Sequence, residues 1–304
     1  MLYLSYGPFV GSMGQCCLMV DGISGGIGMG KDGKALAPLR ALSILFLGIS
    51  FVAVPFWSRA EECGAARDFL TMKLSGSGDP IERALEMSYS GLDADFAKGV
   101  ISLPSGASLA FLPARVGVSG KALMDGATIG DQFTYLYPLA FSLEERKQSF
   151  FDPGRVRNEA FFRELYFGSR SEARKSLAKV IYRGQSQSAS FLVTRKYCMH
   201  IQLKAALEEI ASHGKSMDRF FTKVGGSFNW RLISGTNRLS SHSFGTAIDV
   251  NTQLGKYWKW TGAKEGKVGR YANEIPQALV MAMERRGFIW GGKWNNFRWH
   301  AFRV

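Results

Sequence analysis

The sequence predicts an α+β fold, in which a small, mainly antiparallel sheet is flanked by helices and preceded by an additional N-terminal region. Two observations predict this class. Segments typical of strands and of helices follow one another without the regular strand–helix–strand order of a parallel sheet. The composition, 46% hydrophobic and 21% charged, is that of a folded chain, and 304 residues suffice for one large domain or two modest ones.

Residues 1–60 are expected to contain a secretory signal peptide, with an upstream extension that does not fit such a signal. Arg40 precedes the longest apolar run, residues 41–57, and Ser58 and Ala60 have the small-residue spacing of a signal-peptidase site. Cleavage near Ala60 would place the protein in the periplasm or cell envelope. The alternative is an uncleaved anchor, because residues 41–57 are near the short limit for a membrane span.

Charge and cysteine content add further expectations. The formal net charge of +13 indicates an anionic partner, but basic residues are scattered and no nucleic-acid-binding module is visible, so we expect no nucleic-acid partner. After cleavage, Cys63 and Cys198 would be the only cysteines. They could form a disulfide in an oxidising compartment or remain two free thiols.

Residues 61–190 form an N-terminal region whose role no motif indicates. Residues 99–114 hold two short apolar stretches around a Ser-Gly turn, which predicts a hairpin. Residues 151–182 follow a turn signal at Asp152-Pro153-Gly154 and are expected to be helical in two pieces, broken near Gly168.

Residues 191–304 carry the stronger patterns. Residues 200–214 have apolar positions at helical spacing and end at a glycine, so they predict an amphipathic helix. Residues 227–238 predict a strand followed by a turn. A helix is expected from Pro276 to Gly287, with a short strand after it.

The sequence from Gly245 to Val250 is interpreted as a strand with two different faces. Period two places Gly245, Ala247 and Asp249 on one face of the strand. Thr246, Ile248 and Val250 lie on the other face, which is expected to pack against the core. A buried carboxylate needs a partner, and its small neighbours leave room for one. A turn through Gly245 can bring the ring of His242 back towards Asp249.

An imidazole and a carboxylate that converge on a cleared pocket are typical of a metal site, which needs a third ligand. His300 lies in an aromatic-rich terminal strand that could direct it to the same pocket. The simpler alternative is a hydrogen-bonded His–Asp couple without a metal, since buried polar side chains commonly pair for structural reasons.

The order Ser240-x-His242-x-x-Gly245-x-Ala247-x-Asp249 resembles the SxHxxGxAxD motif of zinc D-alanyl-D-alanine carboxypeptidases, a family that includes VanY-type carboxypeptidases, VanX-type dipeptidases and L-alanyl-D-glutamate endolysins. The segment from Gly287 to Trp294 is also similar to the endolysin-like branch. The resemblance covers about residues 191–304 and implies a Hedgehog/DD-peptidase-like fold. It also implies Zn²⁺ bound by His242, Asp249 and His300, and peptidoglycan peptides as substrates.

The resemblance also implies a role for an arginine, and it contains one departure. Arg231, or otherwise Arg238, would hold the substrate or its oxyanion. The family normally has an acidic general base three positions before the second histidine, where this chain has Phe297, and Glu284 belongs to the preceding helix. Two functions therefore stay open: an exported zinc metallopeptidase acting on stem peptides, or a catalytically impaired cell-wall-binding module that retains the metal fold.

Overall fold

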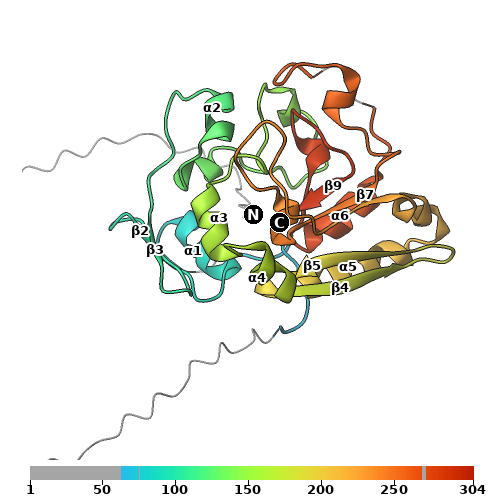
Figure 1. Cartoon of the computed structure of the whole chain (residues 1–304), viewed down its shortest axis with the longest axis horizontal. Coiled ribbons are helices and arrows are strands. Elements are labelled where there is room, and N and C mark those ends of the chain that lie inside the picture. The colour runs from blue at the N-terminus through green and yellow to red at the C-terminus, as the bar shows by residue number, and fades with distance from the viewer. Residues whose placement is uncertain (1–62, 75, 269–271) are drawn as a thin grey trace, which may run out of the picture. The chain divides into compact units, whose positions relative to one another are not determined.

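A four-stranded antiparallel sheet organises the C-terminal half of the protein. The computed structural model describes residues 63–304 apart from residues 75 and 269–271 (Figure 1). In this sheet the strand order is β6–β7–β9–β8, and each neighbouring pair is antiparallel. The strands are β6 (Val224–Gly226), β7 (Ala247–Asn251), β8 (Ile289–Trp290) and β9 (Ala301–Arg303).

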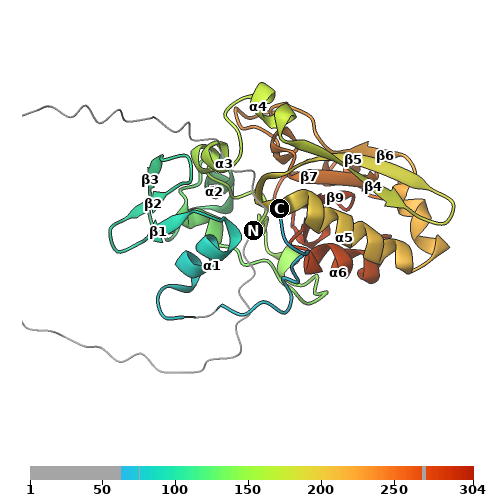
Figure 2. The same ribbon diagram turned by 90° about the horizontal axis from the view of Figure 1, so that it is seen from below.

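Two helices cover one face of this sheet. Helices α5 (Met199–Ser212) and α6 (Gln277–Arg285) lie side by side beneath the strands (Figure 2). Ile248 and Val250 of β7 and Phe302 of β9 are buried against them in the largest hydrophobic core. Because alternate strand residues point to opposite faces, the remaining side chains of β7 and β9 point away from these helices.

A long hairpin extends the sheet. Strands β4 (Leu177–Arg183) and β5 (Ser188–Thr194) pair over their whole length. β5 reaches the central sheet through the Leu192 amide, which donates to Ser227 Oγ at 2.6 Å, and through the Thr194 amide, which donates to the Gly245 carbonyl at 3.1 Å. The expected boundary between residues 190 and 191 therefore falls inside β5.

The N-terminal region forms a second core that includes residues of the C-terminal half. Its elements are α1 (Pro80–Ser88), β1 (Asp93–Asp95), β2 (Val100–Ser102), β3 (Ser108–Ala110), α2 (Gly120–Asp125), α3 (Glu159–Leu165) and α4 (Arg170–Lys175). Asp79 caps α1 by accepting hydrogen bonds from the first-turn amides, and Asn158 caps α3 in the same way. Phe244, from the segment before β7, packs with Phe161 and Tyr166 in this core.

The α+β prediction is confirmed, and so are several of its elements: the hairpin within residues 99–114, the break near Gly168, and the helices within residues 200–214 and 276–287. Two predictions are wrong. Residues 177–182 are the strand β4 rather than helix, because they pair with β5. Residues 227–238 form no strand and contribute only an isolated bridge between Leu232 and Leu239.

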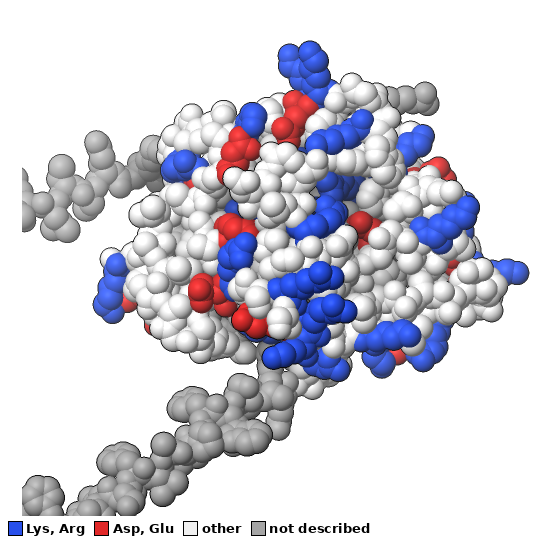
Figure 3. All heavy atoms as spheres, viewed as in Figure 1, with Lys and Arg blue, Asp and Glu red and all other residues white. Residues whose placement is uncertain are grey.

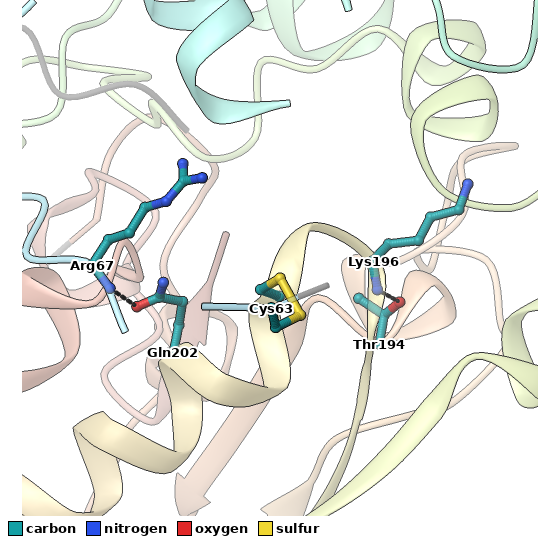
Figure 4. The surroundings of a disulfide bond; sticks show 6 residues. Cys63, Arg67, Thr194, Lys196 and Gln202 are labelled. Carbon is teal, nitrogen blue, oxygen red and sulfur yellow. Dashed lines mark hydrogen bonds between the residues drawn. A yellow bond between two sulfur atoms is a disulfide. The ribbon is translucent and has the colours of Figure 1, made fainter. Parts of the chain in front are cut away.

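Cys63 and Cys198, which are 135 positions apart in the sequence, form a disulfide with their Cα atoms 5.4 Å apart (Figure 4). Of the two alternatives that the sequence left open, the structure thus has the cross-link. It joins the start of the described chain to the N-terminus of α5. Nearby, the Arg67 amide donates to the side-chain oxygen of Gln202 on α5. The start of the N-terminal region is therefore attached to the helical layer.

The expected signal segment, residues 41–57, lies outside the described residues. Within the described part of the chain, none of the helices combines the length and apolar character that crossing a membrane requires.

A buried polar cluster connects the N-terminal region to the segment before β9. Lys293 and Glu284 are both buried and form an ion pair at 2.6 Å. The Tyr137 hydroxyl donates to the Glu284 carboxylate and accepts from the Trp290 amide, while Lys293 donates to the Pro138 carbonyl. Burial raises the pKa of Glu284 and lowers that of Lys293, and each charge partly offsets the effect on the other.

We predict that Lys293→Met lowers the free energy of unfolding by about 3–5 kcal/mol, because it leaves the Glu284 carboxylate buried without its counter-charge. Denaturant unfolding measures this. The double variant Lys293→Met/Glu284→Gln should recover part of the loss. Lys204→Met, which breaks the exposed pair with Glu208, is the matched control and should change stability by less than about 1 kcal/mol. A Lys293→Met variant as stable as the control would contradict the prediction.

Candidate functional site

A short 3-10 turn places His242 immediately before β7. The turn spans Ser241–Phe244 and begins at Ser240, whose hydroxyl accepts from the His242 amide. It ends at Gly245, which has φ 67°, a left-handed conformation that glycine adopts without steric cost. The chain thereby reverses before entering β7, and the predicted return of the His242 ring towards the strand is what the structure has.

The strand β7 has the two faces that the sequence predicted. Ile248 and Val250 are buried in the main core, whereas Ala247 and Asp249 line an open cleft on the opposite face. The cleft has a volume of about 620 Å³, within the roughly 300–1,000 Å³ of a typical small-molecule pocket. It can therefore take a ligand of the size of a short peptide.

Three of the predicted site residues meet in this cleft. His242 Nε2 lies 3.3 Å from Asp249 Oδ2, and His300 Nε2 lies 4.0 Å from the same oxygen. The residue after His300 begins β9, where Ala301 is paired with Asp249, so the antiparallel register brings the second imidazole to the carboxylate. His242, Asp249 and His300 all line the cleft.

The two imidazoles are held by the ring nitrogen that faces away from Asp249. His242 Nδ1 is hydrogen-bonded to the Ser227 carbonyl, and His300 Nδ1 to the Gly255 carbonyl. Because a carbonyl can only accept, each Nδ1 carries the proton, and each Nε2 is left with a lone pair. This is the tautomer and orientation in which histidine side chains bind metals.

The Asp249 carboxylate is also suited to binding a metal ion. Burial raises the pKa of Asp249, but its interactions with His242 and then with His300 outweigh this effect and leave that pKa below its ordinary value. Asp249 Oδ1 is buried and has no hydrogen-bond partner. Burial lowers the pKa of His300 and favours its neutral form. An anionic oxygen and the Nε2 atoms of two imidazoles therefore face the same space.

This donor set fits a divalent cation. Two ligand atoms bonded to one tetrahedral zinc at 2.0–2.1 Å are roughly 3.3 Å apart, which is the His242–Asp249 separation. His300 is further away, and among the described residues no group of three or more His, Cys, Asp and Glu side chains has the geometry of a complete metal site. His300 would have to approach Asp249 slightly to bind the same ion.

Gly255 and Trp260 support His300, and neither residue was identified from the sequence. A Cβ atom at Gly255 would lie 2.4 Å from His300 Cβ and 2.7 Å from its Cα, so only glycine lets the two backbones approach this closely. On the cleft side the ring of Trp260 stacks on the His300 imidazole, with 5.9 Å between ring centroids.

The structure corrects the hypothesis that Phe297 stands in the cleft where a general base would be needed. Phe297 is fully buried in the main core and stacks on Trp299, whereas Arg298 and His300, on alternating positions, line the cleft. Glu284, as expected, belongs to the buried ion pair with Lys293 and not to the cleft. An aspartate at position 297 would therefore be buried in the core.

Two other carboxylates line the cleft besides Asp249. Asp125 is largely exposed and pairs with Lys121. Glu265 is less exposed and accepts from Arg155 at 3.1 Å. The sequence analysis missed Glu265 because it lies 35 positions before His300, in a loop without a recognisable motif.

The remainder of the cleft is strongly basic. Arg231 and Arg238, the two predicted substrate-binding arginines, both line it, and Arg231 is exposed. The cleft contains further arginines and lysines from both halves of the protein, and Lys and Arg side chains also run across the middle of the face drawn in Figure 3. An anionic ligand is therefore favoured.

Comparisons with known proteins identify part of this region. No curated protein and no solved structure gives a significant match to the chain. Residues 234–298 match the sequence model of a D-alanyl-D-alanine carboxypeptidase family, and this segment contains Arg238, His242 and Asp249. The resemblance inferred from the motif is thereby confirmed over this segment, which is similar to D-alanyl-D-alanine carboxypeptidases.

Proposed function

We propose that the protein is an exported zinc peptidase that hydrolyses peptide bonds in peptidoglycan stem peptides, as a carboxypeptidase or as an L-Ala-D-Glu-type endopeptidase. One observation carries the proposal. His242, Asp249 and His300 converge in a cleft with room for a short peptide, and two of the three belong to the segment that matches a peptidase family.

Zinc, when bound by these three side chains, would supply polarisation of the scissile carbonyl and activation of water. The protein's own residues provide the rest of the chemistry. Arg231 is exposed in the cleft and is free to bind the carbonyl oxygen as negative charge develops on it. The Ser227 and Gly255 carbonyls fix the two imidazoles, so that the ligand atoms need little reorganisation.

A proton acceptor is also needed, and Glu265 is our candidate. It is a cleft carboxylate other than Asp249, and its ion pair with Arg155 orients it. Asp125 is a poorer candidate because its side chain is 57% exposed and is paired with Lys121 on its own helix. With Glu265 as base, the phenylalanine at position 297 is compatible with catalysis.

Export is supported by the cross-link between Cys63 and Cys198. Disulfides form and persist in oxidising compartments outside the cytosol, and this one lies just after the expected cleavage position at Ala60. The basic cleft is compatible with an anionic wall polymer. The apolar run of residues 41–57 would direct secretion or anchor the protein to the membrane.

We expect the purified protein to bind about one zinc ion per chain. His242→Ala and Asp249→Ala should weaken zinc binding by more than the roughly 10- to 100-fold that loss of a hydrogen-bond partner behind a ligand costs. Elemental analysis and competition with a chelator measure this. His213→Ala, at the exposed end of α5, is the matched control. Equal metal content in all four proteins would disprove the metal site.

We also expect the zinc-loaded protein to cleave synthetic stem peptides, with kcat reduced roughly 100- to 10,000-fold by Glu265→Gln. Mass spectrometry of the products identifies the bond. The second candidate function is a wall-binding module, which the basic lining of the cleft favours. A wall-binding module would bind zinc and peptide without turnover, in the wild type and in Glu265→Gln alike. That result would contradict the proposal that the protein is an enzyme.

Gly255→Ala should weaken zinc binding about 10- to 100-fold, because the added methyl group displaces His300 and the carbonyl that holds it. Gly126→Ala is the matched control, since a Cβ at Gly126 meets no atom within 4 Å. Zinc affinity and thermal stability are measured together. If Gly255→Ala binds zinc as tightly as the control, His300 is not a ligand or does not depend on this contact.

Processing of the N-terminus tests export. We expect protein from the envelope fraction of its native host to begin shortly after Ala60 and to contain no free thiol, because Cys63 and Cys198 are cross-linked. N-terminal sequencing and alkylation under non-reducing conditions measure both. A membrane-bound form that retains residues 41–57 would indicate the anchor, whereas an intact segment in the cytosolic fraction would contradict export.

A further inference from the structure

Two arginines from different parts of the chain bind consecutive carbonyls of one loop. Arg238 Nη2 donates to the Arg155 carbonyl at 2.8 Å, and Arg303 Nη1 donates to the Gly154 carbonyl at 3.1 Å. Successive Cα atoms are only 3.8 Å apart, so the two carbonyl groups that hold these arginines are neighbours in the loop. Both line the cleft that contains His242 and Asp249.

Neither of these guanidinium groups forms a salt bridge with a described residue, although Glu159 and Asp249 partly offset their charges and Arg303 lies over the Trp294 ring at 4.2 Å. Among the ion pairs of the described residues, none involves Arg238 or Arg303, whereas Arg155 pairs with Asp152 and Glu265. The Nε atoms of Arg238 and Arg303 are buried and have no hydrogen-bond partner. A guanidinium carries five N–H donors, so most of the donor capacity at this point of the cleft is unused.

A third arginine lies directly behind them. Arg157 is 4% exposed, donates to the Leu239 carbonyl and to Ser241 Oγ, and pairs with Glu159. Its Nε atom is also buried without a partner. Burial, and then the positive charge of Arg238, lower its pKa to about 10. Burial and the neighbouring arginines also hold the pKa of Arg303 well below its usual value, so a bound anion would relieve a real repulsion.

The strand register gives the position of this group relative to Asp249. Ala247 is paired with Arg303, and Asp249 with Ala301, so Arg303 and Asp249 belong to the same face of the sheet. The two residue pairs are two positions apart in the register, which corresponds to about 7 Å along the strands. An extended peptide covers that distance in about two residues.

We propose that Arg238 and Arg303, positioned by the Gly154 and Arg155 carbonyls, form a subsite that binds a carboxylate of the peptide substrate about two residues from the cleaved bond. This inference rests on the proposed peptidase function and adds a specificity determinant to it. Guanidinium groups bind carboxylates through paired, charge-assisted hydrogen bonds, which matches the donors left free here.

The subsite gives the N-terminal region a function. The loop that holds both arginines lies in residues 61–190, and neither this loop nor Arg303 belongs to the segment that matches the carboxypeptidase family. The N-terminal region would thus act as one wall of the cleft and select substrates by charge.

Synthetic stem peptides in matched pairs test the subsite. One pair differs by a C-terminal carboxylate or carboxamide, and the other by D-glutamate or its amide. KM and kcat are measured on zinc-loaded protein, with binding measured separately by calorimetry. For at least one of the two pairs, we expect the wild type to bind the carboxylate form roughly 10- to 100-fold more tightly than the amide form. In Arg238→Gln and Arg303→Gln this preference should fall below about threefold, while binding of the amide form is unchanged.

The controls separate the outcomes. Arg174→Gln, exposed on α4, should keep the full preference, and Arg303→Lys should keep part of it. A wild type that cleaves both members of each pair equally well overturns the subsite and leaves the peptidase function standing. Loss of preference in calorimetry without any turnover supports the subsite and overturns the function. Arginine-dependent binding of inorganic phosphate, with no discrimination between the peptides, would assign the arginines to a phosphate group instead and overturn the proposal.

Discussion

The buried ion pair between Lys293 and Glu284 is the interaction on which the placement of the second histidine depends. Two charges without access to water are stable only when they neutralise each other and their remaining hydrogen-bonding groups are satisfied. Tyr137 and the Pro138 carbonyl complete this requirement from the N-terminal region. The segment between Lys293 and β9 therefore starts from a fixed point. Asp152 secures it again by accepting from the backbone amide and side-chain amide of Asn296. With so few residues left before His300, the imidazole has little freedom to leave the cleft.

The requirement that a buried charge be neutralised also applies inside the cleft, where the protein does not meet it. Asp249 is also a largely buried carboxylate, but its Oδ1 atom has no hydrogen-bond partner, and its Oδ2 atom faces two imidazoles whose Nε2 atoms have no proton to donate in the tautomer that the Ser227 and Gly255 carbonyls favour. A buried carboxylate with an orphaned oxygen and two facing lone pairs is costly without a cation. Glu284 is neutralised by the protein itself, whereas Asp249 is left for something that the protein does not contain. This contrast is the physical reason to regard the first carboxylate as structural and the second as functional.

The sequence was informative where a pattern is local and uninformative where partners are distant. The faces of β7 followed from period two, and the return of His242 followed from Gly245, because both features lie within ten residues. The segment 227–238 was expected to be a strand. Instead, the Asn229 amide and the Arg231 amide bind the turn that carries His242, so its backbone groups are already used. The alternation of buried Ala178, Val180 and Tyr182 becomes meaningful only with β5 beside it. Similarly, the contact of Gly255 with His300 joins positions 45 residues apart, and no spacing rule reveals it.

The position of Phe297 shows why a motif and a structure can disagree about one residue without disagreeing about the site. Counting back from His300 assigns Phe297 to the place of an acid, yet the chain alternates here, so that Phe297 and Trp299 enter the core while Arg298 and His300 face the cleft. A carboxylate for the cleft has to come from elsewhere in the fold, and the loop that contains Glu265 supplies one through its contact with Arg155. Arg155 and its neighbour Gly154 belong to the N-terminal region and also fix Arg238 and Arg303. The segment that matches the peptidase family thus contributes His242 and Asp249, while the charge that surrounds them is organised by a region outside it.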